Sequence, residues 1–202
     1  ERRAEWLRWI IGALGHRRGG GEQHFYIKFD CWSALDLNLI ERAFPDVPWI
    51  FVYRDPLEIL VSQLRRRGAH MVPGVLEPSL LGLDEADVAR MPTEEYCARV
   101  LASVCESVLR SFRNERALLI NYTQLPEAVC STIAKFFGVE YTDAEQERML
   151  RAAQFDAKNP SMNFVGDTGR KRLEASDTLR AATDRWVRPL YEQLEELRLA
   201  AR

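Results

Sequence analysis

The fold is decided by the stretch Trp49-Ile-Phe-Val-Tyr-Arg-Asp-Pro-Leu-Glu-Ile-Leu-Val-Ser62. Its first five residues are nearly all apolar, which predicts a strand covered on both faces and therefore central in a parallel sheet. Asp55 then follows as a helix N-cap, with Pro56 in the first turn and Glu58 three residues after the cap. The stretch therefore predicts a buried strand that runs directly into a helix.

Strand and helix patterns also alternate along the rest of the chain. Two further short runs have strand character, 24–29 and 117–121, and helical patterns lie at 6–14, 35–43, 93–112, 129–137, 143–152 and 177–198. This alternation is typical of an α/β fold, with a parallel sheet flanked by helices. We expect one domain over 1–202, with a Gly- and Pro-rich flap at about 68–92 and a polar, irregular loop at about 154–176.

Composition excludes several classes of protein. The 202 residues are 47% hydrophobic, so a substantial core is expected and a disordered chain is not. The 28 Lys and Arg nearly balance the 30 Asp and Glu, so no global basic field points to nucleic acid or an anionic membrane. The apolar run from Trp6 to Leu14 contains Arg8 and is too short to span a bilayer. These features predict a soluble protein without a membrane span.

The cysteines and histidines show no metal-ligand spacing. Cys31, Cys97, Cys105 and Cys130 contain no CxxC pair, so buried free thiols in a reducing, cytoplasmic compartment are expected, and no metal. His24 and His70 are not paired in the sequence with a nucleophile, and we expect them to be structural.

Polar residues follow the three expected strands at the points where ligands gather in a parallel sheet. The first strand ends at Lys28-Phe-Asp30, the second at Arg54-Asp55 and the third at Asn121-Tyr-Thr123. Arg54 is expected beside free amides of a helix N-terminus, and Ser62 lies on the helix face nearer that loop. A fixed cation, a hydroxyl and a helix dipole together suit a phosphate.

With these residues identified, a family resemblance can be stated. Val52 to Ser62 resembles the 3′-phosphate-binding signature of sulfotransferases, an Arg after a central strand and a Ser eight residues later. Three other segments resemble the same family in the same order: 26–30 the strand that carries the catalytic base, 119–125 with 136–138 the later strand and helix, and 166–172 the basic loop that closes over the nucleotide. The resemblance runs through most of the chain and implies a P-loop-like sulfotransferase fold.

The resemblance implies a donor and a set of roles. The donor would be 3′-phosphoadenosine 5′-phosphosulfate, whose sulfuryl group passes to a hydroxyl or amine without a metal. Arg54, Ser62, Arg170 and Lys171 would bind the 3′-phosphate, Lys28 the phosphosulfate bridge, and Asp30 would be the base. The acceptor is not deducible from the flap: a small molecule or carbohydrate is expected, with protein tyrosine or a polysaccharide left open, as is the oligomeric state.

The sequence departs from the family pattern in two places. Asp30 stands where many members have His, so a carboxylate would replace an imidazole. Nothing before Glu22 has the form of the first strand and phosphate-cradling loop, since the glycines at 19–21 follow a helix. We expect that an N-terminal part of the complete enzyme is missing, or that the site is incomplete. Two alternatives stay open: a nucleotide-dependent small-molecule kinase, and a noncatalytic nucleotide-binding or interaction module of the same fold.

Overall fold

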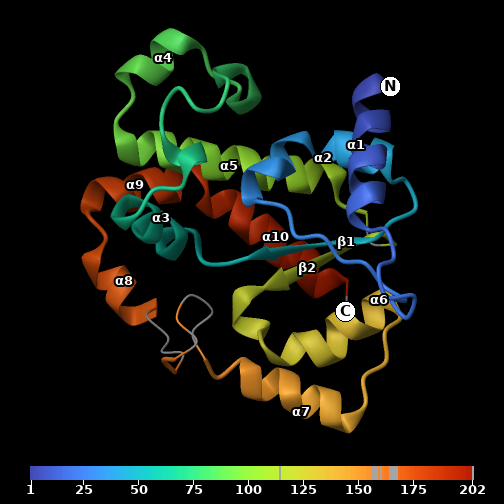
Figure 1. Cartoon of the computed structure of the whole chain (residues 1–202). Coiled ribbons are helices and arrows are strands. Elements are labelled where there is room, and N and C mark those ends of the chain that lie inside the picture. Colours follow the sequence, from blue (N-terminus) through green and yellow to red (C-terminus); the bar gives the residue numbers. More distant parts are fainter. Residues whose placement is uncertain (114, 156–158, 160, 164–167, 202) are drawn as a thin grey trace.

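The computed structural model describes residues 1–113, 115–155, 159, 161–163 and 168–201. Two parallel strands and a set of helices make up this part of the chain (Figure 1). The main helices are α1 (Arg2–Leu14), α2 (Leu37–Ala43), α3 (Pro56–Arg65), α4 (Glu85–Arg90), α5 (Thr93–Ser111), α6 (Ala134–Phe137), α7 (Asp143–Ala152), α8 (Thr168–Glu174), α9 (Asp177–Trp186) and α10 (Arg188–Ala200). Short helical turns are η1 (Cys31–Asp36), η2 (Ala69–Met71), η3 (Pro78–Leu81), η4 (Tyr122–Gln124) and η5 (Val129–Ile133).

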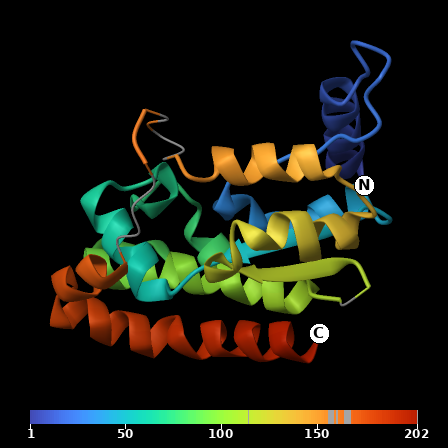
Figure 2. The same ribbon diagram turned by 90° about the horizontal axis from the view of Figure 1, so that it is seen from below.

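The strands β1 (Trp49–Tyr53) and β2 (Ala117–Asn121) pair in parallel register, Trp49 with Ala117 and Tyr53 with Asn121. Figure 2 shows α10 and α5 on one side of these strands and α6 and α7 on the other. The α/β class, with a parallel sheet flanked by helices, is therefore confirmed, with two strands among the described residues.

Two sequence-based predictions about the sheet are wrong. Residues 24–29 lie in an irregular segment that is exposed throughout, and no ladder within the described chain includes them. Strand propensity favours an extended backbone, but a strand also needs a neighbour that accepts and donates its hydrogen bonds. The strand β1 is also not covered on both faces, because Val52 is 43% exposed.

The core is organised around α5, the longest helix. Tyr96, Cys97, Val100, Val104 and Val108 recur at helical spacing along it, and each is almost completely buried. This helix packs against α3, α9 and α10 and against the turns η1, η2 and η3. It therefore joins most parts of the molecule in one core.

The expected flap contributes to this core. Met71, Leu76, Leu81 and Val88 are buried members of the same hydrophobic cluster as the α5 residues. The segment therefore has too little periodicity for long helices but enough apolar side chains to be fixed against α5.

The end of α9 shows how proline divides a continuous apolar pattern. The sequence predicts one helix over 177–198, whereas the structure has α9 and α10 separated at Val187. Pro189 lies in the first turn of α10, where its missing N–H costs nothing, but within a single helix it would remove a hydrogen bond. The new helix begins at Arg188.

The helix α1 is joined to α2 through a guanidinium. Arg8 donates from Nε to the carbonyl of Ala43 at 2.7 Å and from Nη2 to the carbonyl of Arg42 at 2.8 Å. These are carbonyls at the C-terminus of α2, which a cation stabilises.

In the described part of the chain no helix is both long and apolar enough to cross a membrane.

A polar network holds α10 to the ends of both strands. Glu195 accepts hydrogen bonds from Tyr53 Oη, from Asn121 Nδ2 at 3.0 Å and from Arg198 Nη2 at 2.7 Å. Asn121 also donates to Tyr191 Oη at 3.1 Å. The Arg198 guanidinium, followed by the other hydrogen bonds, lowers the pKa of Glu195 to about 2, although partial burial opposes the shift.

This network predicts a stability that depends on pH. The Glu195 contribution is fully present above the ordinary carboxyl pKa of 4.5 and is lost as pH falls toward about 2, because only the ionised form accepts all these bonds. At neutral pH we expect Glu195→Gln to lower the unfolding free energy by about 2–3 kcal/mol, measured by urea denaturation. The difference from the wild type should shrink steadily between about pH 5 and pH 2. A difference that stays constant over this range would contradict the assignment.

Candidate functional site

The candidate site lies where both strands end. Because β1 and β2 are parallel and in register, Tyr53 and Asn121 are neighbours, and the residues that follow them meet at the same edge of the sheet. The Arg54 guanidinium lies over the ring of Tyr122, 5.0 Å from its centroid. Two of the three strand ends expected from the sequence therefore lie side by side, and Tyr122 supplies a cation–π contact that the sequence did not indicate.

Asp55 caps α3 as predicted. Its Oδ1 accepts hydrogen bonds from the amides of Leu57 and Glu58 at 3.0 and 3.3 Å. The expectation of free amides beside Arg54 is therefore wrong for these two groups, because the carboxylate of the chain itself already binds them. An external anion here has to rely on side chains.

Arg54 turns toward α3 and pairs with Glu58. Its Nε lies 2.5 Å from Glu58 Oε2, and Nη2 contacts the same oxygen. The side chain of Glu58 is only 4% exposed, and that of Arg54 is 23% exposed. A carboxylate buried to this degree needs a cation partner, so the pair fixes the orientation of Arg54.

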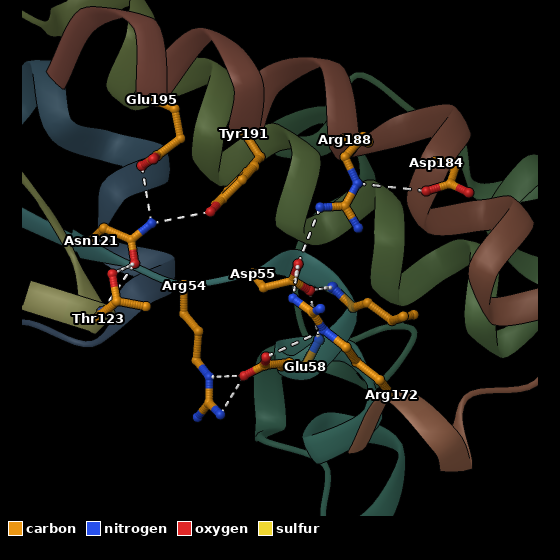
Figure 3. A network of polar contacts seen from close by, with 11 residues as sticks. Arg54, Asp55, Glu58, Asn121, Thr123, Arg172, Asp184, Arg188, Tyr191 and Glu195 are labelled. Atoms are coloured by element: carbon orange, nitrogen blue, oxygen red, sulfur yellow. Dashed lines mark hydrogen bonds and ion pairs between the residues drawn. The ribbon is translucent and has the colours of Figure 1, made fainter. Parts of the chain in front are cut away.

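A distant segment joins the same carboxylates. The helix α8 packs against α3, and Arg172 lies 3.4 Å from Asp55 Oδ2 and 3.8 Å from Glu58 Oε1. Further along the two helices Arg65 pairs with Glu174. Figure 3 shows Glu58 between Arg54 and Arg172. The basic segment expected near the nucleotide thus lies along α3, the helix that follows Arg54 and carries Ser62, and part of the expected loop, 168–174, is helical.

Arg188 is a member of the site that sequence reasoning missed. Its Nη1 lies 3.2 Å from Asp55 Oδ2 and its Nε 3.6 Å from Asp184 Oδ1. A cation at the first residue of a helix opposes the helix dipole, so it needs a carboxylate nearby. That unfavourable position, next to Pro189, was the signal in the sequence.

The other expected phosphate ligands lie on these two helices. Ser62 is exposed and occupies the helical stripe of α3 that begins at Glu58 and continues to Arg65. Lys171 lies in α8 with only 6% of its surface exposed. The backbone of Arg170 is in α8, but its side chain lies outside the described residues.

Lys28 and Asp30 lie in the irregular segment instead of at a strand end. Both are exposed. Burial lowers the pKa of His70, and the charge of Asp30 opposes this in part. The next residue, Cys31, contacts the flap directly, with its Sγ 3.4 Å from His70 Nε2. The sequence did not indicate this contact between the segment of Asp30 and the flap.

The site is a compact mixture of opposite charges. Three guanidinium groups, those of Arg54, Arg172 and Arg188, surround the carboxylates of Asp55 and Glu58 (Figure 3). An anion that binds here has to displace a carboxylate from a guanidinium group. Within the described ranges, no group of three or more His, Cys, Asp or Glu side chains could hold a metal ion. Two surface hollows lie elsewhere, beside α6 and α7, and none of their lining residues belongs to this site.

Comparisons of the chain with protein-family models, with curated proteins and with solved structures found no match.

The two roles of Asp55 can be separated by substitution. Asp55→Asn keeps a capping oxygen but removes the charge that pairs with Arg172 and Arg188, so we expect a loss of about 1 kcal/mol in the free energy of unfolding. Asp55→Ala removes the cap as well and should cost about 1 kcal/mol more. Urea denaturation of both variants against the wild type checks this. Equal losses for Asn and Ala would show that the cap contributes nothing.

Proposed function

We propose that the chain is a sulfotransferase domain whose donor is 3′-phosphoadenosine 5′-phosphosulfate. The observation that carries the proposal is the contact of Arg172 with Asp55 and Glu58, which joins α8 to the start of α3, directly after Arg54. Asp55 and Arg172 are 117 residues apart in the sequence and lie side by side in the structure. They belong to the two segments that resemble nucleotide-binding elements of sulfotransferases. This proximity favours one shared anion site over separate surface charges.

The 3′-phosphate would bind at this junction. Arg54 would offer guanidinium donors, Ser62 a hydroxyl, and Lys171, with Arg170, the ammonium and guanidinium of α8. Charge-assisted hydrogen bonds to phosphate are stronger than those between neutral groups, which allows the phosphate to compete with Glu58 for Arg54. Tyr122, beneath the guanidinium, would keep it in the plane it occupies now.

In the proposed reaction the acceptor oxygen or nitrogen forms a bond to sulfur while the bond from sulfur to the bridging phosphate oxygen breaks. Asp30 takes the proton from the acceptor, and Lys28 neutralises the charge on the departing bisphosphate. As in phosphoryl transfer, catalysis rests mainly on positioning and charge neutralisation. The contact between the Asp30 segment and the flap supports an acceptor site on this side.

One observation favours the noncatalytic alternative, a nucleotide-binding module of related fold. Lys28 and Asp30 are exposed in an irregular segment, and groups for sulfuryl transfer need fixed positions. A chain that binds adenosine 3′,5′-bisphosphate but transfers no labelled sulfuryl group would support that alternative. Measurable transfer that is lost in Asp30→Asn would exclude it.

Calorimetric titration with adenosine 3′,5′-bisphosphate tests the nucleotide site. We expect Arg54→Ala to weaken binding about 10- to 100-fold, because a hydrogen bond to a charged group contributes about 1.5–3 kcal/mol. Ser62→Ala should weaken it about threefold to tenfold. ATP with Mg²⁺, the ligand expected of a kinase, should bind more weakly than the bisphosphate.

Two controls accompany this titration. Arg54→Gln leaves a donor for the buried Glu58 carboxylate and should weaken binding without the fold defect that Arg54→Ala risks. Arg110→Ala removes an exposed guanidinium of α5 whose described ion pair, with Glu106 at 3.7 Å, lies within the same helix. This control substitution should leave the affinity for the bisphosphate unchanged. Unchanged affinity in both Arg54 variants would refute the proposed site.

A further inference from the structure

The four cysteines of the chain have very different environments. Cys97 and Cys105 are buried in α5 as predicted, Cys130 is intermediate, and Cys31 is exposed, so the prediction of a buried thiol is wrong for Cys31. Burial raises the pKa of Cys97, and it raises the pKa of Cys105 to about 12. A buried thiol of this kind is both inaccessible and almost fully protonated at neutral pH. Cys31 therefore differs from the thiols of α5 in being open to reagents.

Cys31 also has a base beside it. Its Sγ lies 3.4 Å from Nε2 of His70, a contact between the first residue of η1 and the middle of η2. The imidazole occupies space that Gly68 leaves open, because a Cβ at Gly68 would lie 2.6 Å from Cε1 and 2.9 Å from Nδ1 of the ring. The Gly68 amide in turn donates to Gln63 Oε1 at 2.8 Å. The ring is thus held by local packing in a position from which it reaches the sulfur.

Loss of contact with water favours the neutral form of both groups. Burial lowers the pKa of His70, and the nearby Asp30 carboxylate opposes this in part. Cys31 is an exposed residue, but the protein atoms around its sulfur remove part of the water, and this is the largest effect, which raises its pKa. A hydrogen bond from the Trp32 backbone lowers the pKa, the Asp30 charge raises it and the Lys28 charge lowers it. Two further charges act on Cys97 in the neighbouring helix α5: Arg67, which follows α3, lowers its pKa, and Glu94 in α5 raises it. At neutral pH the pair is therefore a thiol next to an unprotonated imidazole.

We propose that Cys31 is a thiol-modification site that reacts with disulfides of small thiols, with His70 as the base. Cys31 Sγ attacks one sulfur of the disulfide, a new S–S bond forms at Cys31, and the S–S bond of the reagent breaks. His70 Nε2 takes the Cys31 proton and passes it to the departing thiolate. The exchange needs no other oxidant, because the reagent disulfide is reduced as Cys31 is oxidised.

The position of Cys31 gives the modification a consequence. Asp30 precedes it directly and η2 of the flap faces it, so a thiol adduct would occupy the space between the irregular segment and the flap. The modification itself needs no nucleotide and no acceptor, and its test is therefore independent of the proposed sulfuryl transfer.

The test is the rate of mixed-disulfide formation with glutathione disulfide, followed by mass spectrometry of peptides that contain each cysteine. At pH 7 we expect Cys31 to react at least about tenfold faster than Cys130, which serves as the internal control. The wild-type rate at Cys31 should stay level between the imidazole pKa and the thiol pKa, because a neutral thiol with a neutral imidazole is the reacting form. In His70→Gln the rate at pH 7 should fall at least about tenfold and rise about tenfold per pH unit, as for an unassisted thiol.

Two results would overturn the proposal. The first is a wild-type rate at Cys31 that climbs tenfold per pH unit without a level region, and the second is equal rates at Cys31 and Cys130. The wild-type pH profile keeps the test valid even if His70→Gln disturbs the fold, which reaction at Cys97 and Cys105 would reveal. Cys31→Ser should abolish the fast adduct, and Cys130→Ser should retain it.

Discussion

The carboxylate of Asp55 is the group on which the arrangement of this molecule depends. It caps α3 through two backbone amides, and its other oxygen meets Arg188 at the start of α10 and Arg172 in α8. The end of β1, two C-terminal helices and α3 are therefore held at one point. Because Asp55 both caps α3 and pairs with Arg172 and Arg188, one residue starts α3 and positions α8 and α10 beside it.

A second polar contact, also made by α10, complements this one at the strand ends. Glu195 binds Tyr53, Asn121 and Arg198, so α10 is attached to both strands as well as to Asp55. The result is a strand edge where Arg54 has a fixed orientation but also a carboxylate partner. This edge is a mixture of opposite charges and not an open basic patch, which agrees with the near balance of charges in the whole chain.

Local signals in the sequence predicted most helices and both strands. Asp55 before Pro56 defines a helix start, and Gly138, which adopts a left-handed conformation with φ of 63°, ends α6 as its position indicates. The segment 24–29 was not predictable in the same way, because pairing in a sheet depends on a neighbour and not on propensity. For the site, the closeness of Arg54 and Arg172 followed from a resemblance, whereas Arg188 required the long-range packing of α10 to be known.

We propose that the guanidinium of Arg54 and the helix α8 form one phosphate site at the end of β1. A crystal structure of the chain with adenosine 3′,5′-bisphosphate tests this site directly. We expect the ribose 3′-phosphate within hydrogen-bond distance of Arg54 and Ser62, with Glu58 displaced from the guanidinium. A nucleotide bound elsewhere, with the pair of Arg54 and Glu58 intact, would contradict it.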